Sequence, residues 1–246
     1  SYPNRTYDKA DYGLVEKPWG LDAGNNASAP GIKLINLVIH DTAQGPGIWR
    51  NATDQELYGC IIFNNGYDAP DRGHGHGTYT QSETTPRRIV DNIIFNQYGY
   101  GIHAYGSARA FLNDFHIEGN ILFDNGAASK VSGYTGNILV GGGRVAERPI
   151  IRHNCSYFIP PKKGGVACQL NYGQGSLNPV VEDNYFVSGG RSFTLKSEGG
   201  RITRNVFIGA TQGFDATAHA GNTVLAAAPS GSRVFVRPNK YEPGRA

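Results

Sequence analysis

The chain of 246 residues has little charge and no cluster of it. Asp, Glu, Lys and Arg together make up 17% of the residues, the formal net charge is +3, and no run of Lys or Arg occurs. Proteins that bind nucleic acid carry a concentrated basic patch, so we expect no nucleic-acid partner. No stretch approaches the roughly 20 consecutive apolar residues that a membrane helix needs, so we expect no membrane span.

Cysteine is also scarce. Cys60, Cys155 and Cys168 are an odd number without Cys-x-x-Cys spacing, which excludes a cysteine metal frame and gives no disulfide scaffold. Each lies in an apolar, strand-like pattern, so we expect three buried thiols. The chain contains no Met, but it contains 34 Gly, together with many Asn, Ile and Tyr. This composition is typical of short strands and tight turns.

One repeat runs through most of the sequence. Its unit is an apolar residue, two variable residues and an Asn, followed by a branched apolar run, as in Ile89-Val-Asp-Asn92 before Ile93-Ile94-Phe95. The Asn position recurs every 21 to 34 residues, at Asn92, Asn120, Asn154, Asn184 and Asn205, with Cys60 in the same place one unit earlier and with Asn36 and Asn222 as possible extensions. Repeats of this length indicate a solenoid, whose units bury their apolar faces by stacking on one another.

The secondary structure expected for each repeat unit indicates which kind of solenoid forms. Each unit contains two or three short strands broken by Gly or Asn, and none has the long helix-forming stretch of helical or leucine-rich repeats. We therefore predict an all-β fold, a right-handed parallel β-helix of about seven or eight coils. One Asn per coil would hydrogen-bond its amide to the Asn above and below and form a buried asparagine ladder.

We expect three segments. Residues 1–30 lack a period and form an irregular entry segment, residues 31–228 form the β-helix, and residues 229–246 form a tail that leads to a further segment. The exposed terminal coils are templates for end-to-end self-association.

Several stretches carry a family resemblance. The chain resembles the right-handed parallel β-helix superfamily of pectate lyases and related polysaccharide-active proteins from about Gly31 to Leu225, through GIKLINLVIHD, YGCIIFNNG, PDRGHGHGTYTQ and RIVDNIIFNQYGYGIHAYG. Together with the closing RVFVRPNKYEPGRA, these are similar to a bacterial group of secreted β-helix proteins of unassigned reaction. The resemblance implies a secreted or cell-surface protein whose partner is a polysaccharide.

The strand that follows each Gly turn is expected to present outward residues in rows. These strands are aligned on one inward residue each: Ile48, Thr78, Ile102, Ile138, Val166, Phe193 and Phe214. In this alignment the outward positions of the first coils carry aromatic side chains beside amides. Aromatic faces with flanking polar groups suit sugar rings. The predicted substrate-binding residues are Trp49, Asn51, Tyr79, Gln81, Arg144 and Arg148.

His103 and Tyr105 are the catalytic candidates. They are two residues apart on a strand and therefore share a face. An imidazole can take a proton and a phenol can donate one, which is the chemistry of a lyase or an epimerase acting on a uronate polymer. Arg109, Arg144 or Arg148 would neutralise the uronate carboxylate. The alternative is a non-catalytic carbohydrate-binding or structural solenoid. Glycoside hydrolysis needs two carboxyl groups facing the groove, and the aligned rows contain almost none.

A second cluster allows a divalent metal ion as cofactor. His74 and His76 are alternate residues and would point to one side of an extended segment, where Asp71 could complete a site. The competing interpretation is a hydrogen-bonded, Gly-rich turn at the edge of the groove.

Overall fold

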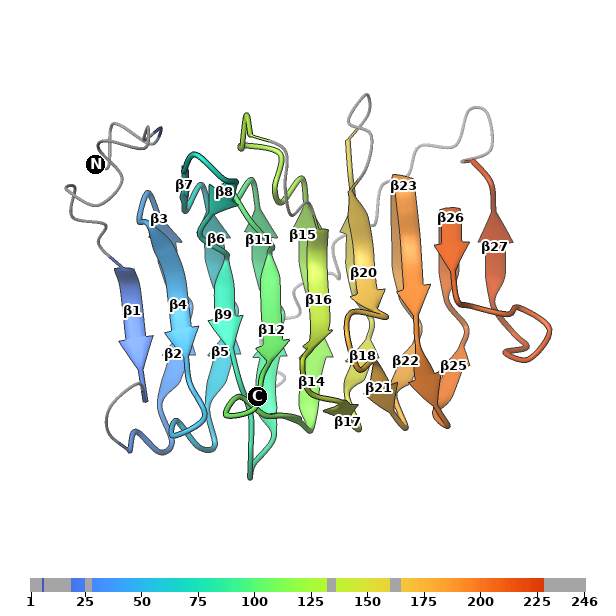
Figure 1. Cartoon of the computed structure of the whole chain (residues 1–246), viewed down its shortest axis with the longest axis horizontal. Helices are drawn as coiled ribbons and strands as arrows, with labels where there is room; N and C mark the ends of the chain where they lie inside the picture. Colours follow the sequence, from blue (N-terminus) through green and yellow to red (C-terminus); the bar gives the residue numbers. More distant parts are fainter. Residues whose placement is uncertain (1–5, 7–18, 25–27, 132–135, 160–164, 228–246) are drawn as a thin grey trace, which may run out of the picture.

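Each coil of the chain consists of three short strands separated by tight turns. The computed structural model describes residues 6, 19–24, 28–131, 136–159 and 165–227, and these ranges contain strands and no helix. A helix that could cross a membrane is consequently not found in the described part of the chain. Each main strand pairs in parallel with its counterparts in adjacent coils, so three sheets run along the solenoid (Figure 1). The predicted parallel β-helix is confirmed.

The three sheets are named here by their order along each coil. Sheet 1 consists of β1 (Trp19–Ala23), β4 (Gln44–Ile48), β9 (Thr78–Thr80), β12 (Ile102–Gly106), β16 (Gly136–Gly142), β20 (Val166–Leu170) and the second halves of β23 (Tyr185–Leu195) and β26 (Val206–Gln212). Sheet 2 consists of β2 (Lys33–Ile35), β5 (Glu56–Tyr58), β10 (Arg87–Val90), β14 (Phe115–Glu118), β18 (Ile150–Arg152), β22 (Val180–Glu182) and β25 (Arg201–Thr203). Sheet 3 consists of β3 (Val38–His40), β6 (Ile61–Phe63), β11 (Ile93–Phe95), β15 (Ile121–Phe123), β19 (Cys155–Tyr157), the first halves of β23 and β26, and β27 (Thr223–Leu225).

Two smaller groups of strands decorate the coils. A short parallel sheet follows sheet 1 at one corner and contains β13 (Leu112–Asn113), β17 (Ala146–Glu147), β21 (Ser176–Leu177) and β24 (Ser197–Glu198). The strands β7 (Tyr67–Asp68) and β8 (Gly73–His74) form an antiparallel hairpin. Sheet 2 has seven strands, which gives seven coils in the described ranges and agrees with the predicted number.

The segment expected to be irregular before residue 31 contains a strand. Trp19–Ala23 form β1, which pairs in parallel with β4 and so belongs to the first coil. Residues 1–5, 7–18 and 25–27 of that segment and the tail at residues 229–246 lie outside the described residues.

The interior is filled by rows of apolar side chains, one per coil. On sheet 2 the inward row is Leu34, Leu57, Ile89, Ile117, Ile151, Val181 and Ile202, and these residues are aligned by the strand pairing. Branched aliphatic residues stack well in this arrangement because they are rigid at χ1. The three cysteines are buried and free, as predicted, and burial raises the pKa of Cys155 to about 12. Such a thiol is inert at neutral pH.

The asparagine ladder is confirmed. Asn120 is fully buried, and its Nδ2 donates to Asn154 Oδ1 at 3.0 Å and to the carbonyl of Ile89 at 2.8 Å. Its Oδ1 accepts from the backbone nitrogen and the Nδ2 of Asn92, at 3.0 and 2.9 Å. The same bonds join Asn92, Asn120, Asn154, Asn184, Asn205 and Asn222. The ladder therefore satisfies turn backbone that would otherwise be buried without partners.

The extension of the ladder to Asn36 is wrong. The backbone nitrogen of Leu37 donates to Cys60 Sγ at 3.4 Å, so Leu37 holds the ladder position of that coil. Asn36 has a φ of 53°, and the residue before the ladder position has a positive φ in every coil. Asn, Asp and Gly tolerate this left-handed conformation best, and they occupy this place in all coils except those with His153 and Arg204.

A second amide ladder lies at the turn after sheet 3. The backbone nitrogen of Asn65 donates to Gln97 Oε1 at 3.0 Å, that of Gln97 to Asn125 Oδ1 at 3.4 Å, and that of Asn125 to Asn137 Oδ1 at 3.2 Å. Three of these amides stand two residues after the Phe that ends a strand of sheet 3, a recurring pattern that the sequence reasoning overlooked.

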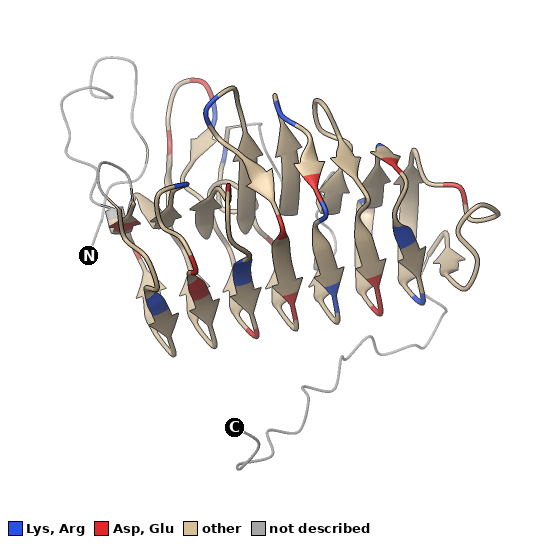
Figure 2. Ribbon diagram, turned by 90° about the horizontal axis from the view of Figure 1, so that it is seen from below, with Lys and Arg blue, Asp and Glu red and all other residues tan. Residues whose placement is uncertain are grey.

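The outer surfaces of sheets 2 and 3 are occupied by contacts between coils. On sheet 3 the rings of His40, Phe63, Phe95, Phe123 and Tyr157 stack at centroid distances of 4.7–5.3 Å. Figure 2 shows basic and acidic segments alternating between neighbouring coils on the face that contains sheet 2, where Arg88 bonds to Glu56 and Arg152 bonds to Glu118. On sheet 3 the stacked rings cover one another's flat faces. The outer surface of sheet 3 therefore stabilises the solenoid and does not present ring faces to a ligand.

The ladder gives a stability prediction. Asn120→Leu leaves the backbone nitrogen of Asn92 without its acceptor and removes the hydrogen bonds that Asn120 makes with Asn92 Nδ2 and with the carbonyl of Ile89, all in the core. Each such group costs about 1–3 kcal/mol, so we expect the free energy of unfolding to fall by about 3 kcal/mol or more, measured by urea denaturation. Asn222→Leu, at a half-buried ladder position, should cost less because water can reach the groups left behind. Equal losses in the two variants, or none, would contradict the ladder's role.

Candidate functional site

The predicted site residues lie on the outward face of sheet 1, but the strand register places them beside other residues than predicted. Ile48 pairs with Thr80, and Ile138 pairs with Cys168, so β4 and β20 are each shifted by two residues from the expected alignment. The alignment of Phe193 with Phe214 is also wrong, because Phe193 pairs with Thr211. A shift of two residues preserves the inward and outward alternation. The predicted facing of Trp49, Tyr79, His103 and Tyr105 is therefore correct, while Trp49 lies beside Gln81.

These side chains line an open pocket of about 470 Å³, a volume within the usual range of ligand sites. We call it the aromatic pocket, because six of its lining residues are Trp49, Tyr67, Tyr79, Tyr100, Tyr105 and Tyr172. The lining also includes three histidine rings, those of His74, His76 and His103. The residues come from five successive coils, the second to the sixth, and from the β7–β8 hairpin, so no single repeat contains the site.

His103, on β12, is surrounded by rings. Its centroid is 4.0 Å from that of His76, 4.9 Å from Tyr79 and 5.4 Å from Tyr105. Tyr100 stacks on it at 5.0 Å with an interplanar angle of 1°. The Nδ1 atom of His103 is buried and has no hydrogen-bond partner in the described part of the chain. A buried polar atom of this kind is costly in a folded core unless a water molecule or a ligand reaches it.

Both imidazoles are neutral at pH 7. Burial, assisted by the nearby charges of His74 and Arg72, lowers the pKa of His76 to about 3. Burial is the main cause that lowers the pKa of His103 well below its usual value near 6.5, and the charge of Arg72 and, once it is protonated, that of His76 act in the same direction. The backbone nitrogen of Tyr100 donates to His76 Nδ1 at 2.9 Å, so the neutral ring of His76 carries its proton on Nε2.

The remaining aromatic groups are held in fixed positions. The indole nitrogen of Trp49 donates to Asp22, and the Trp49 ring meets the Tyr79 ring edge-on at 5.0 Å. Tyr105 contacts Tyr172 at 5.9 Å. Burial raises the pKa of Tyr79. A phenol with a raised pKa stays protonated and can donate its proton.

A buried arginine anchors one side of the pocket. Arg87 donates to the carbonyls of Trp49 at 3.2 Å, Ala52 at 2.7 Å and Gln81 at 2.7 Å. Burial lowers its pKa to about 10, which leaves it charged at pH 7. Because these carbonyls belong to two different coils, Arg87 fixes the backbone of Trp49 relative to that of Gln81.

The β7–β8 hairpin forms the rim and contributes Tyr67, Arg72 and His74. The carboxylate of Asp68 accepts from Ser129 Oγ and from the backbone nitrogen of Lys130, which ties the hairpin to the loop after sheet 3. Tyr67 stacks on His74 at 5.3 Å, with an interplanar angle of 4°. The hairpin therefore supplies a preformed wall with one arginine.

The predicted metal site is not assembled. His74 Nε2 bonds to Asp71 Oδ1 at 2.9 Å, and this bond lowers the pKa of Asp71. His76 instead packs against His103, and its Nδ1 accepts a hydrogen bond from the backbone nitrogen of Tyr100. In the described ranges no three His, Cys, Asp or Glu side chains are grouped to hold a metal ion. Gly75, with a φ of 88°, lies between the two histidines, and the bond between His74 and Asp71 favours the interpretation of a hydrogen-bonded turn.

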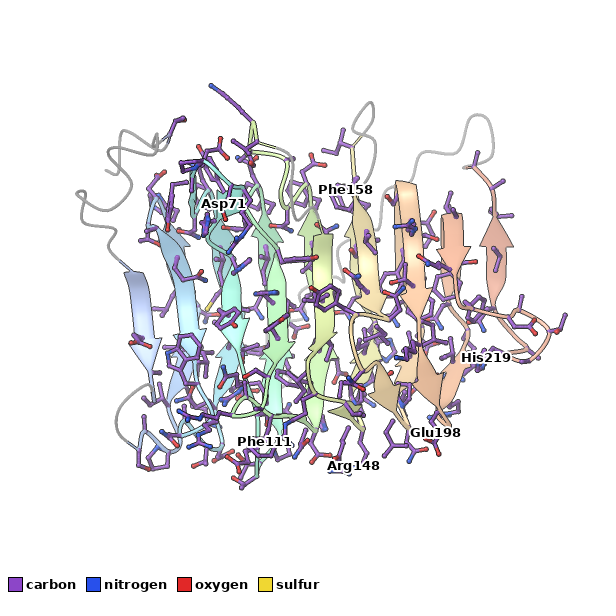
Figure 3. All side chains as sticks on the ribbon, viewed as in Figure 1. Asp71, Phe111, Arg148, Phe158, Glu198 and His219 are labelled. Carbon is purple, nitrogen blue, oxygen red and sulfur yellow. The ribbon has the colours of Figure 1, made fainter. Side chains whose placement is uncertain are left out.

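The structure separates the predicted arginines from the pocket. Arg144 lies 3.9 Å from the ring centroid of Phe111 and donates to the carbonyls of Ser107 and Ala108. Arg148 bonds to Asp114 and Glu147. Figure 3 places Phe111 and Arg148 at the opposite end of the coils from Asp71, which neighbours the pocket rim. Arg109 and Asn51 line a separate depression together with Gln81.

Several lining residues were not among the predicted site residues. Tyr67, Arg72, Tyr100 and Tyr172 all line the aromatic pocket but lie in turns or at strand ends, outside the aligned rows. The clustering of Tyr near His in GHGHGTY and YGYGIHAY is the one sequence signal that points to some of them.

The pocket contains groups for stacking and for proton transfer. Its described lining includes neither Asp nor Glu, so the two-carboxylate arrangement of glycoside hydrolysis is not formed by these residues. It offers flat aromatic faces, one guanidinium, a neutral imidazole and phenol groups. These suit a sugar ring with its apolar C–H faces and its hydroxyl groups.

The coils and the pocket define a solenoid protein with a ligand site on the outside of one parallel sheet. The family model for the right-handed beta helix region matches residues 20–145, which are 126 of the 246 residues. The chain therefore belongs to this family, and the predicted hand of the coil is confirmed. No curated protein and no solved structure gave a significant match.

The lowered histidine pKa values predict a pH dependence of stability. Between pH 6.5 and the lower folded-state values, the unfolded chain binds more protons than the folded chain, so stability falls as the pH falls. We expect the free energy of unfolding to drop by at least about 1 kcal/mol from pH 7 to pH 5, measured by urea denaturation. His76→Gln should make this dependence shallower, whereas His219→Gln, far from the pocket, should not. An unchanged slope in His76→Gln would contradict the assignment.

Proposed function

We propose that the protein is a secreted or cell-surface protein that acts on a polysaccharide, one sugar residue of which enters the aromatic pocket. The single observation that carries this proposal is the pocket's wall of aromatic rings around a buried, unpartnered imidazole nitrogen. Sugar rings stack on aromatic faces through their C–H groups, and their hydroxyls can donate to the free nitrogen of His103.

The reaction that fits this wall is β-elimination or epimerisation of a uronate residue. His103 is unprotonated at neutral pH and can accept the proton on the carbon next to the carboxylate. In elimination, the C–H electrons form a C=C bond, the glycosidic C–O bond breaks, and Tyr105 donates a proton to the leaving oxygen. In epimerisation, Tyr105 returns a proton to the opposite face of the carbon. Arg72, which forms an ion pair with Asp71, is the arginine of the pocket lining, and it replaces Arg109 as the group that would neutralise the carboxylate.

A non-catalytic carbohydrate-binding role is the second candidate. The observation in its favour is the strongly lowered pKa of His103, because a general base works best when its pKa is near the working pH. In this case the same nitrogen accepts a hydrogen bond from a sugar hydroxyl and no covalent bond changes.

The two candidates separate in an activity assay. We expect the protein to generate unsaturated ends, followed by absorbance, on one of a panel of uronate polymers, or to change their NMR spectrum if it is an epimerase. His103→Gln and Tyr105→Phe should each lower kcat by about 10²-fold or more, while His116→Gln, on β14 outside the pocket, should not. Polymer binding without a spectral change in either assay would assign the protein to the non-catalytic class.

The aromatic wall predicts binding losses under both candidates. Tyr79→Ala removes a ring that contacts Trp49, His76 and His103. We expect about tenfold weaker polysaccharide binding by calorimetry, since an aromatic contact of this type contributes about 1 kcal/mol beyond the area it buries. Tyr58→Ala, an exposed tyrosine on sheet 2, is the matched control. Equal affinities of these two variants would place the polysaccharide elsewhere.

A further inference from the structure

A second depression adjoins the aromatic pocket at Trp49, which lines both. It has a volume of about 370 Å³, and none of its lining residues in the described part of the chain is acidic. We call it the basic subsite. Its polar lining consists of Arg50, Asn51, Gln81, Ser107 and Arg109.

The polar side chains of the basic subsite are largely uncommitted. Arg109 is exposed and makes no hydrogen bond or ion pair within the described ranges, unlike the neighbouring Arg144. Arg50 approaches the carboxylate of Glu83 only to 3.8 Å. The guanidinium of Arg109 is thus available to an anionic ligand, and guanidinium groups pair well with carboxylates through two parallel hydrogen bonds.

Strand register fixes how the two sites are related. Thr80 pairs with both Ile48 and Ala104, so the next residues, Trp49, Gln81 and Tyr105, occupy one row on three adjacent strands. Tyr79 and His103 precede this row and belong to the aromatic pocket, while Asn51 and Ser107 follow it and belong to the basic subsite. The two sites therefore succeed each other along the strand direction, on the same coils. The rows of outward residues expected from the sequence run from coil to coil instead.

We infer that the basic subsite binds a second residue of the same polymer, that this residue carries a carboxylate paired with Arg109, and that the polymer lies parallel to the strands of sheet 1. Trp49 then separates two adjoining sugar residues. This inference rests on the proposed function, because it takes the first sugar residue to occupy the aromatic pocket. It names the substrate class as an acidic, uronate-containing polysaccharide.

Calorimetry with defined uronate oligosaccharides tests the inference. The probes are the monosaccharide, disaccharide and tetrasaccharide of the galacturonate and alginate types, with the carboxyl methyl esters of the same oligomers as neutral counterparts. We expect the native protein to bind the tetrasaccharide at least about tenfold more tightly than the monosaccharide, and Arg109→Gln to remove about tenfold of tetrasaccharide affinity. Arg109→Gln should leave binding of the monosaccharide and of the methyl esters unchanged.

The control is Arg191→Gln, which removes another exposed arginine of sheet 1 outside both sites. Gln81→Ala provides an independent variant within the basic subsite and should also weaken tetrasaccharide binding selectively. Equal tetrasaccharide affinities of Arg109→Gln and Arg191→Gln would overturn the second subsite while leaving the proposed function intact. Failure of the native protein to bind any of the oligosaccharides would overturn both.

Discussion

Hydrogen bonding between adjacent coils, along the axis of the solenoid, is the interaction on which the rest of the structure depends. Parallel strands lie about 4.8 Å apart, and every buried turn must find partners for its backbone at that same spacing. The asparagine ladder does this on one corner and the Asn65–Gln97–Asn125–Asn137 ladder on another. Because the coils are fixed in this way, the outward side chains of sheet 1 are held at defined separations, which is the preorganisation that a binding site needs.

The site arises where the regular stack is interrupted. The β7–β8 hairpin extends from one coil and contributes a wall of the pocket with Arg72. Arg87 is buried and bonds to backbone carbonyls of two coils. The stacked aromatic rings of sheet 3 show the contrast, since rings placed at equal intervals without an insertion cover one another. The pocket therefore depends on departures from the repeat as much as on the repeat.

The electrostatics of the pocket also depend on its three-dimensional packing. From sequence, His103 is an ordinary imidazole that titrates near pH 6.5. In the structure it lies against His76, Tyr79 and Tyr100, and burial among these rings lowers its pKa. The closeness of His76 is set by a backbone hydrogen bond from Tyr100, in the next coil, which no local pattern predicts.

The sequence by itself determined the solenoid, its ladder and the outward facing of Tyr79, His103 and Tyr105, because these follow from repeat period and strand alternation. Only the tertiary structure decided which coils are neighbours at each position. Turns of unequal length shifted β4 and β20 by two residues and placed Arg144 and Arg148 away from the pocket, while His74 bonds to Asp71 and His76 packs against His103. A shift of two residues leaves the apolar pattern unchanged and is therefore invisible in sequence, although it changes every contact between adjacent coils.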